Sequence, residues 1–254
     1  MAPNSVEILW ELGVGSRLVG VSRYTVYPPQ LAHVPRIGGQ RDPNLEAIVT
    51  LGPDLVILRG RQEKLEKLCR DRGIAVFYDP TNRLSDVYET ITRLGAMFDR
   101  VEQADALCRR VRERLARVQG RAAGRPAVKV LLTMRGPDRL ANIGTVGQGS
   151  YLHELIELAG GENVFGDLDV AYPQVSIEEI VVRRPEVIIE VSPGGRPAGG
   201  YVQLAEQWHP LRQIPAVRNG RVHVLTEDYA MIPSPRLVLL AEKLLSLLHP
   251  DVAD

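Results

Sequence analysis

The feature of this 254-residue sequence that most constrains its fold is a short block that occurs twice. Residues 44–49 (NLEAIV) and 53–57 (PDLVI) recur as residues 176–181 (SIEEIV) and 185–189 (PEVII), at a constant offset of 132 residues. Each copy contains a capping residue, a short helical segment, a proline, an acid and an apolar run typical of a buried strand. Because the copies lie in opposite halves of the chain, they predict two similar α/β lobes rather than one large core.

Helix-like and strand-like segments alternate along both halves, which is typical of an α/β fold with mostly parallel strands. Apolar runs predict strands at residues 18–22, 54–58, 74–78, 128–133, 187–189 and 222–225. Amphipathic patterns predict helices at residues 44–51, 62–70, 85–97, 151–159, 176–182 and 235–248. Ser85 and Ser234 are expected to cap the helices that follow them.

The longest predicted element is a helix near the middle of the chain, at residues 99–119. Apolar residues recur every three or four positions from Val101 to Val118, between arginines and acids, and no turn residue occurs before Gly120. Such a helix would be about 30 Å long. We therefore expect an N-terminal lobe, a connecting helix and a C-terminal lobe, at residues 1–98, 99–122 and 123–254. A ligand cleft is expected between the lobes, at the carboxyl ends of the strands.

Composition and charge argue against several classes of protein. The 31 Lys and Arg residues balance 31 Asp and Glu residues, whereas nucleic-acid binders usually carry a net positive charge. No apolar run reaches the ~18–20 residues that a membrane-spanning helix needs. Cys69 and Cys108 have no metal-binding spacing and are interpreted as buried thiols, with a disulfide as the less favoured alternative. The histidines are scattered along the chain, so no metal site is expected.

A glycine-rich segment leaves one enzymatic alternative open. Residues 144–149 (GTVGQG) precede a predicted helix and could cradle a phosphate at its N-terminus, as in a cytosolic α/β enzyme acting on a phosphorylated small molecule. The segment lacks the Lys-Ser/Thr ending of a P-loop, and the chain has no nucleophile elbow or dinucleotide fingerprint. A mobile loop is therefore the favoured interpretation.

Tyrosines and arginines gather at predicted junctions between strands and loops. The tyrosines are Tyr24, Tyr27, Tyr172 and Tyr229, and the arginines are Arg23, Arg59 and Arg61. Broad rings at such positions suit stacking on a large planar ligand, with half-buried packing as the alternative. Arginines there could pair with carboxylates or phosphates of a ligand, or simply be solvated.

Glu46 and Glu178 occupy equivalent first-turn positions in the two copies of the repeated block. Compensation of the helix dipole, typically worth ~0.3–1 kcal/mol, is the simpler explanation. The alternative is a matched pair of exposed acids, one in each lobe, that meets a two-fold symmetric basic partner.

A series of stretches, in order along nearly the whole chain, carries a resemblance to a known family. The stretches are residues 2–9, 18–24, 27–29, 38–39, 42–46, 53–57, 160–165, 172–176 and 234–236. They resemble the helical-backbone group of periplasmic binding proteins, which are the solute-binding proteins of ABC importers for cobalamin and iron chelates. The resemblance implies two α/β lobes joined by one long helix, with no catalytic residue, no cofactor and no metal of its own. A non-transporting interaction module that keeps the lobes remains a further alternative.

The resemblance also implies a ligand and the residues that contact it. Tyr24 and Tyr172 match positions that contact the corrin ring in cobalamin binders, whereas Gln40 and Arg59 stand where those relatives have aromatic residues. The predicted ligand is cobalamin, and the departures at Gln40 and Arg59 keep a carboxylate-bearing ferric siderophore or haem as alternatives. The full predicted ligand-binding set is Tyr24, Gln40, Arg59, Tyr172, Asp228 and Tyr229.

Finally, the resemblance implies a partner and a location. Glu46 and Glu178 would dock on arginines of a dimeric membrane permease, and the chain would act as a monomer. Such proteins lie in the periplasm or are anchored outside the cytoplasm, but no signal peptide follows Met1. The family normally has a first strand that ends just before Ala2. We therefore expect an N-terminal truncation or a misassigned start.

Overall fold

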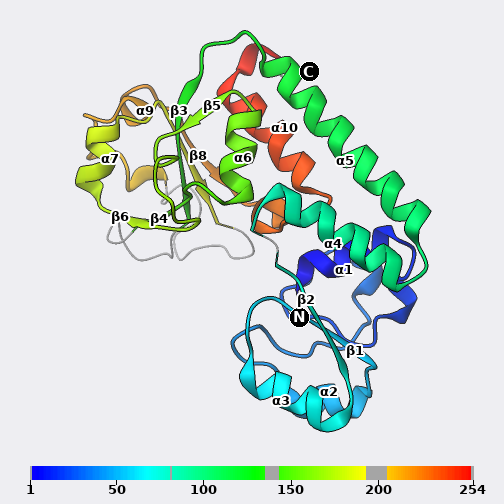
Figure 1. The fold of residues 1–254 in the computed structure, drawn as a ribbon. Coiled ribbons are helices and arrows are strands. Elements are labelled where there is room, and N and C mark those ends of the chain that lie inside the picture. Colours follow the sequence, from blue (N-terminus) through cyan, green and yellow to red (C-terminus); the bar gives the residue numbers. More distant parts are fainter. Residues whose placement is uncertain (1, 81, 135–142, 193–204, 253–254) are drawn as a thin grey trace. The chain divides into compact units, whose positions relative to one another are not determined.

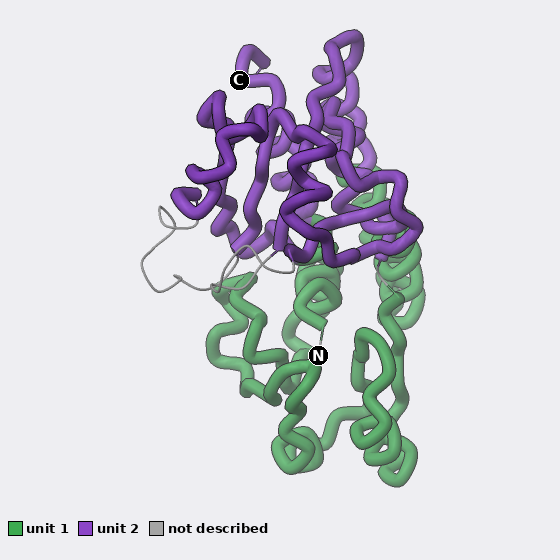
Figure 2. Tube along the Cα trace, turned by 90° about the vertical axis from the view of Figure 1, so that its left-hand side faces the viewer, with its two compact units in different colours: residues 1–81, 85–111, 232–235 green, residues 82–84, 112–231, 236–254 purple. Residues whose placement is uncertain are grey.

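The computed structural model describes residues 2–80, 82–134, 143–192 and 205–252. The chain divides into two compact units (Figure 2). Unit 1 comprises Met1–Thr81, Ser85–Val111 and Ile232–Pro235, and unit 2 comprises Asn82–Leu84, Arg112–Met231 and Arg236–Asp254. Helix α5 (Val101–Ala122) begins in unit 1 and ends in unit 2. Within the ranges given above, no helix is both long enough and apolar enough to cross a membrane.

Unit 1 is built on a small parallel sheet (Figure 1). Strands β1 (Leu55–Leu58) and β2 (Ala75–Tyr78) pair along their whole lengths. The helical segments of this unit are α1 (Pro3–Glu11), η1 (Gly15–Arg17), η2 (Pro29–Leu31), α2 (Leu45–Leu51), α3 (Glu63–Arg72) and nearly all of α4 (Leu84–Met97). Val56 and Leu58 of β1 pack in a core with Ile48 of α2 and with Leu65 and Cys69 of α3.

The ends of α2 and α3 follow from local sequence signals. Before α2, the Asn44 side chain accepts a hydrogen bond from the Ala47 backbone N–H at 3.0 Å. Gly52 and Gly73 end the two helices with φ of 56° and 67°, a left-handed conformation that glycine adopts without steric cost. The first copy of the repeated block therefore forms the predicted helix and strand.

The described residues of unit 2 form a mixed six-stranded sheet of order β6-β4-β3-β7-β8, in which β5 also pairs with β3. The strands are β3 (Val128–Met134), β4 (Ile143–Thr145), β5 (Gly161–Asn163), β6 (Gln174–Val175), β7 (Val187–Val191) and β8 (Val222–Leu225). Strands β5, β7 and β8 belong to the parallel part, whereas β4 runs antiparallel to both β3 and β6. The prediction of mostly parallel strands thus holds around β7, and β4 is the exception.

Helices cover both faces of this sheet (Figure 1). Helices α6 (Tyr151–Leu158) and α10 (Leu237–Leu248) lie on one side, and α7 (Ile177–Arg183) and α9 (Pro215–Arg218) lie on the other. Two 3₁₀ segments, η3 (Asp228–Met231) and η4 (Pro250–Val252), flank α10 along the chain. Ile188 of β7 packs in a core with Ile180 of α7, Ala216 of α9 and the fully buried Trp208.

The strand predicted at residues 18–22 is wrong. Residues 15–17 form η1, and within 18–22 only Val21 makes a bridge, to Arg36. Val19 is 45% exposed. An apolar run becomes a strand only where a second backbone lies along it, and the described part of unit 1 supplies one at Val21 alone.

Two predicted helix caps are also wrong. Helix α4 begins one residue before Ser85, which therefore lies inside the first turn. Helix α10 begins after Arg236, and Ser234 instead donates its hydroxyl to Glu7 Oε2 at 2.5 Å, with both residues buried. The reason is tertiary, because the buried Glu7 carboxylate needs a hydrogen-bond donor and Ser234 supplies it.

Candidate functional site

In unit 1, the predicted ligand-binding residues Tyr24, Gln40 and Arg59 lie close together. The Tyr24 residue is 63% exposed, and its ring packs on Gly39, where an added Cβ would come within 2.7 Å of the ring atom Cε2. The adjacent Gln40 donates Nε2 to the Arg59 backbone carbonyl at 2.6 Å. A side chain at position 39 would displace the ring, so this glycine is required for the arrangement.

An ion pair stands beside the Tyr24 ring. Arg23 donates Nη2 to Asp42 Oδ2, and the Arg23 guanidinium carbon lies 6.0 Å from the centroid of the Tyr24 ring. Both partners are about half exposed, so the pair contributes little to stability, about 0–1 kcal/mol. It holds the loop that carries Tyr24 while leaving the ring open to solvent.

In unit 2, Asp228 and Tyr229 lie in η3, just after β8. Arg236 donates Nη1 and Nη2 to the two carboxylate oxygens of Asp228, both at 3.0 Å, and its guanidinium carbon lies 5.9 Å from the Tyr229 ring centroid. Burial, with Glu227 and Asp228 nearby, raises the pKa of the Tyr229 phenol. Tyr229 therefore presents a neutral hydroxyl at neutral pH.

Arg236 is a candidate site residue that sequence reasoning missed. Its bidentate contact with Asp228 fixes the carboxylate and brings a positive charge over the Tyr229 ring. The signal that could have found it is its place in the stretch 234–236, which carries part of the family resemblance.

Tyr172 lies at the opposite edge of the same sheet, just before β6, and is 38% exposed. The register Gln174–Gly144–Met134 places the start of β6 level with the end of β3. In the order β6-β4-β3-β7-β8, four strand spacings separate β6 from β8, which corresponds to about 19 Å at ~4.8 Å each. The sheet order therefore separates Tyr172 from Asp228 and Tyr229, which lie after β8 at its other edge.

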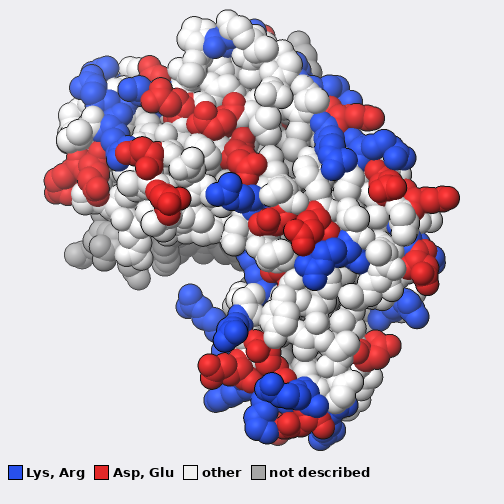
Figure 3. Space-filling view, in the orientation of Figure 1, with Lys and Arg blue, Asp and Glu red and all other residues white. Residues whose placement is uncertain are grey.

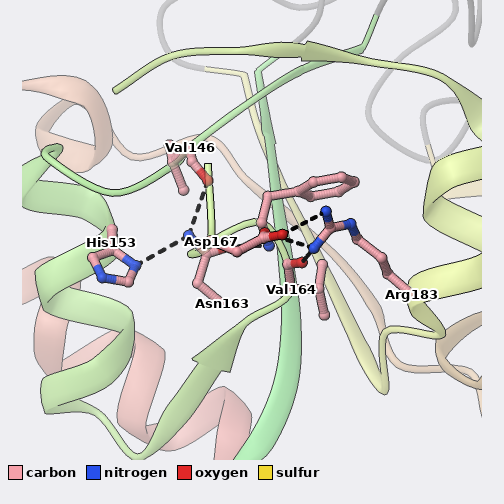
Figure 4. A network of polar contacts seen from close by, with 7 residues as sticks. Val146, His153, Asn163, Val164, Asp167 and Arg183 are labelled. Atoms are coloured by element: carbon pink, nitrogen blue, oxygen red, sulfur yellow. Dashed lines mark hydrogen bonds and ion pairs between the residues drawn. The ribbon is translucent and has the colours of Figure 1, made fainter. Parts of the chain in front are cut away.

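A polar network fixes the loop between β5 and β6 that leads to this tyrosine (Figure 4). Asn163 donates Nδ2 to the Val146 carbonyl at 2.9 Å, and the same atom lies 3.2 Å from His153 Nδ1. Further along, Asp167 accepts two hydrogen bonds from Arg183 of α7, at 2.6 and 2.9 Å. His153 is thus engaged within the fold. No group of three or more His, Cys, Asp or Glu residues that could hold a metal ion occurs in the described ranges.

Residues 144–149 do not form a phosphate cradle. An added Cβ would come within 2.6 Å of a backbone carbonyl at Gly144 and within 2.3 Å of one at Gly147, so both glycines serve close packing of the chain. The amides of Gly147 and Gln148 donate to carbonyls in the loop 168–171. The interpretation as a mobile loop is also wrong for Gly144, because it belongs to β4.

Glu46 and Glu178 occupy the second positions of α2 and α7, and both are exposed. Figure 3 shows acidic side chains over α7 and charges of both signs over α2 and α3. In α7, Ser176 and Glu179 form a reciprocal capping box, with Glu179 accepting from the Ser176 N–H at 2.8 Å and Ser176 accepting from the Glu179 N–H at 3.2 Å. Capping is therefore done by other residues, and within the described ranges no ion pair holds the Glu46 or Glu178 carboxylate.

Unit 1 also contains a cavity of about 650 Å³ that is separate from these candidates. Its walls come from α1, residues 14–20, the end of α2, β1 and the end of α4. Tyr24, Gln40 and Arg59 do not line it. The cavity is therefore distinct from the predicted ligand-binding residues of unit 1.

Comparison with known proteins assigns the chain to a family. Residues 1–229 match the family model for periplasmic binding proteins. The chain belongs to the periplasmic binding protein family. The vitamin B12-binding protein of Vibrio cholerae is 31% identical over 246 residues, which cover 96% of this chain and 85% of the relative. The vitamin B12-binding protein of Salmonella typhimurium is 30% identical over 246 residues, covering 96% and 86% of the two chains.

Solved structures share the fold of this binding protein. The periplasmic vitamin B12 binding protein of Vibrio cholerae has a TM-score of 0.80 and 29% identity, over 98% of this chain and 94% of that chain. A periplasmic haem-binding protein from a Roseiflexus species has a TM-score of 0.83 and 27% identity, over 100% and 97%. The predicted family and the α/β fold class are confirmed, and the family is one of binding proteins rather than enzymes. The enzymatic alternative is therefore wrong.

Proposed function

We propose that this protein is the substrate-binding component of an ABC importer and that its ligand is cobalamin. The observation that carries the proposal is the 31% identity to a vitamin B12-binding protein across 96% of the chain. It is supported by Tyr24 and Tyr172, which are exposed at the positions predicted to contact a corrin ring. Aromatic rings open to solvent supply a large contact area for a planar macrocycle at a low cost in conformational entropy.

The residues around Tyr24 suggest how unit 1 contributes to binding. Gln40 donates Nε2 to Arg59 O, so its Oε1 atom is oriented as an acceptor for an amide side chain of the ligand. The Arg59 guanidinium would contact a phosphate or carboxylate. In unit 2, Tyr172 would contact the macrocycle, and Asp228 and Tyr229 would contribute polar contacts held in place by Arg236.

Haem is the second candidate, and the arginine at position 59 is the observation that favours it. An arginine at this position suits the propionate carboxylates of haem, because arginine and carboxylate form paired, charge-assisted hydrogen bonds. The haem-binding relative from Roseiflexus has 27% identity to this chain. A ferric siderophore with carboxylates would be recognised by the same chemistry.

We further propose that Glu46 and Glu178 dock on basic residues of a dimeric permease, on the outer side of a cytoplasmic membrane. The support is their equivalent position in the repeated block, their exposure, and the absence of an ion pair to either carboxylate within the described ranges. Rim charges of this kind raise the rate and specificity of association more than the affinity.

The ligand proposal is tested by titrating the protein with cyanocobalamin, haemin and a ferric hydroxamate, followed by visible absorbance and calorimetry. We expect saturable binding of cyanocobalamin. Binding of haemin alone would replace cobalamin by the second candidate, and no binding of any of the three would contradict the ligand assignment.

Variants then test the site itself. Tyr24→Ala and Tyr172→Ala are each expected to weaken cyanocobalamin binding by about tenfold, which corresponds to ~1.4 kcal/mol. Tyr24→Phe keeps the ring and should bind nearly as the parent does. Val26→Ala is the matched control, because Val26 is 59% exposed on the same loop. An equal loss in the Val26 variant would show that the loop is disturbed rather than that the Tyr24 ring is a contact.

A further inference from the structure

A short segment, residues 232–236, joins η3 to the start of α10, and we call it the strap. Its sequence is Ile-Pro-Ser-Pro-Arg, and the three central residues are buried. It follows η3, which carries two of the predicted ligand-binding residues, and it ends at Arg236, the residue before α10. The strap is therefore a buried connection that ends on the residue whose guanidinium holds the Asp228 carboxylate.

The two prolines make the strap stiff. A proline ring fixes its own φ near −65° and restricts the residue before it to extended backbone, so the four residues 232–235 are all restricted. The Ser234 N–H also donates to the Ile232 carbonyl at 2.8 Å. Because a stiff segment has few alternative conformations, the place where Ser234 is held decides where Arg236 lies.

Ser234 is held by a buried carboxylate of α1. Its hydroxyl donates to Glu7 Oε2 at 2.5 Å, and the exposed fractions are 0% for Ser234 and 2% for Glu7. Hydrogen bonds to a charged acceptor are shorter and stronger than bonds between neutral groups. The two residues are 227 positions apart in the sequence, so only the fold brings them together.

Glu7 has a fixed position of its own because α1 is anchored. In the first turn of α1, Asn4 Nδ2 and Ser5 Oγ each donate to Asp79 Oδ2 at 2.6 Å, and Asp79 directly follows β2. Thr90 of α4 donates its hydroxyl to Asp79 Oδ1 at 3.4 Å. These contacts tie α1 to the sheet of unit 1, so Glu7 offers Ser234 an acceptor that the core of this unit keeps in place.

The other end of the strap is constrained by α10 and η3. The Arg236 carbonyl accepts from the Leu239 N–H at 2.9 Å, at the start of α10. The Arg236 side chain is 15% exposed and makes the bidentate contact with Asp228. Beside Asp228, Glu227 pairs with Lys243 of α10 at 3.5 Å. The geometry of η3 therefore depends on the start of α10, which the strap determines.

We propose that Glu7 and Ser234 are positioning residues for the ligand contacts made by η3. Their hydrogen bond fixes the strap and thereby the place of Arg236, and the Arg236 guanidinium orients Asp228 and the Tyr229 ring. Neither Glu7 nor Ser234 touches the ligand. This role rests on the proposed function, in which Asp228 and Tyr229 contact the ligand.

The first test measures η3 in the protein without ligand. Ser234→Ala removes the hydroxyl that donates to Glu7, and Ser5→Ala is the matched control, because it removes another buried serine hydroxyl that donates to a carboxylate, at 2.6 Å. We expect amide hydrogen exchange at residues 228–231 to be about threefold or more faster in the Ser234 variant than in the Ser5 variant. Equal rates in the two variants would show only a loss of overall stability and would overturn the proposal.

The second test measures the Kd for cyanocobalamin. Ser234→Ala is expected to raise Kd by about fivefold and Ser5→Ala by less than about twofold. Arg236→Lys removes the bidentate contact with Asp228 and should weaken binding by itself. Adding Ser234→Ala to Arg236→Lys should weaken binding little further, because both changes act on the same contact. Losses that multiply in the double variant would overturn the proposal.

A further variant covers the case in which Ser234→Ala does not fold. Glu7→Gln combined with Ser234→Ala leaves a neutral amide at position 7, so no buried charge loses its donor. This double variant should show the same faster exchange at residues 228–231 and the same loss of affinity, and values like those of the parent would overturn the proposal. If the parent does not bind cyanocobalamin, the proposed ligand is wrong, whereas the exchange rates still decide whether Glu7 and Ser234 position η3.

Discussion

The two copies of the repeated block form the same local elements in different surroundings. In unit 2, β7 lies between β3 and β8, and all five of its residues are buried. In the described part of unit 1, β1 pairs with β2 alone, and Leu55 and Ile57 are only half-buried beside the cavity. Matching sequence patterns therefore give a central strand in one unit and an edge strand in the other. The comparison teaches that the neighbouring strands, and not the block itself, decide how much of a strand is buried.

The largest expected effect comes from truncating the equivalent isoleucines of the two strands. Ile189→Ala in β7 removes a fully buried side chain and should lower the free energy of unfolding by about 3–4 kcal/mol. Ile57→Ala in β1 should cost about 1–2 kcal/mol, because Ile57 already borders a cavity. Urea unfolding of both variants measures the difference. Equal losses would contradict the contrast between a central and an edge strand.

A smaller difference is expected between the two helix caps. Ser176→Ala removes a capping box from α7 and should lower the free energy of unfolding by about 1–2 kcal/mol, whereas Asn44→Ala removes a single cap from α2 and should cost about 1 kcal/mol. Ser176→Asp keeps a capping oxygen and serves as the control. Thermal unfolding of the three variants is the measurement, and a larger loss in the Asn44 variant would be the contrary result.

The two exposed acids offer a comparison of function rather than stability. Glu46→Gln and Glu178→Gln are each expected to lower transport in reconstituted vesicles by a few-fold, while leaving the Kd for ligand unchanged, because rim charges act mainly on association. Glu162→Gln is the matched control, since Glu162 is an exposed glutamate on β5. A change in ligand affinity with unchanged transport would contradict a role for these acids in docking on the permease.

The smallest expected effect is a pH dependence confined to α7. Hydrogen bonds from the Ser176 N–H, and then from its hydroxyl, lower the pKa of the Glu179 carboxyl. Because the folded pKa lies below the ordinary glutamate value of about 4.3, the ionised form adds stability above that pH, and this stability is lost as the pH falls through the lowered pKa. Glu179→Gln should therefore reduce the fall in the free energy of unfolding that accompanies acidification, as measured by urea unfolding at a series of acid pH values. The equivalent residue in α2 is Ala47, so Asn44→Ala should leave that fall unchanged.

Local signals in the sequence were sufficient to predict the helices and their ends where the residue that caps or ends the helix lies next to it in the sequence. Asn44 and Ser176 cap as predicted, Gly52 and Gly73 end their helices, and α5 spans the segment of strict apolar periodicity. The prediction of buried free thiols is also confirmed. These features depend on residues within one or two turns, which periodicity and capping preferences describe well.

The predictions that failed depend on residues far apart in the sequence. Among the described residues, the segment 18–22 finds a bridging partner only at Val21. Ser234 donates a hydrogen bond to Glu7, which lies near the other end of the sequence. Gly144 and Gly147 allow two chain segments to pack closely and do not form a ligand site. At the candidate site, Tyr24, Gln40 and Arg59 lie close together, and the role of Arg236 depends on where Asp228 lies in space.

The open edge of β1 has a consequence for solubility. Its four residues, Leu-Val-Ile-Leu, contain no lysine or proline, the residues that usually protect a strand edge from pairing with other molecules. A short apolar edge of this composition is a template on which a second chain can add its own strand and begin aggregation. Concentrated preparations of the protein are therefore expected to self-associate at this edge.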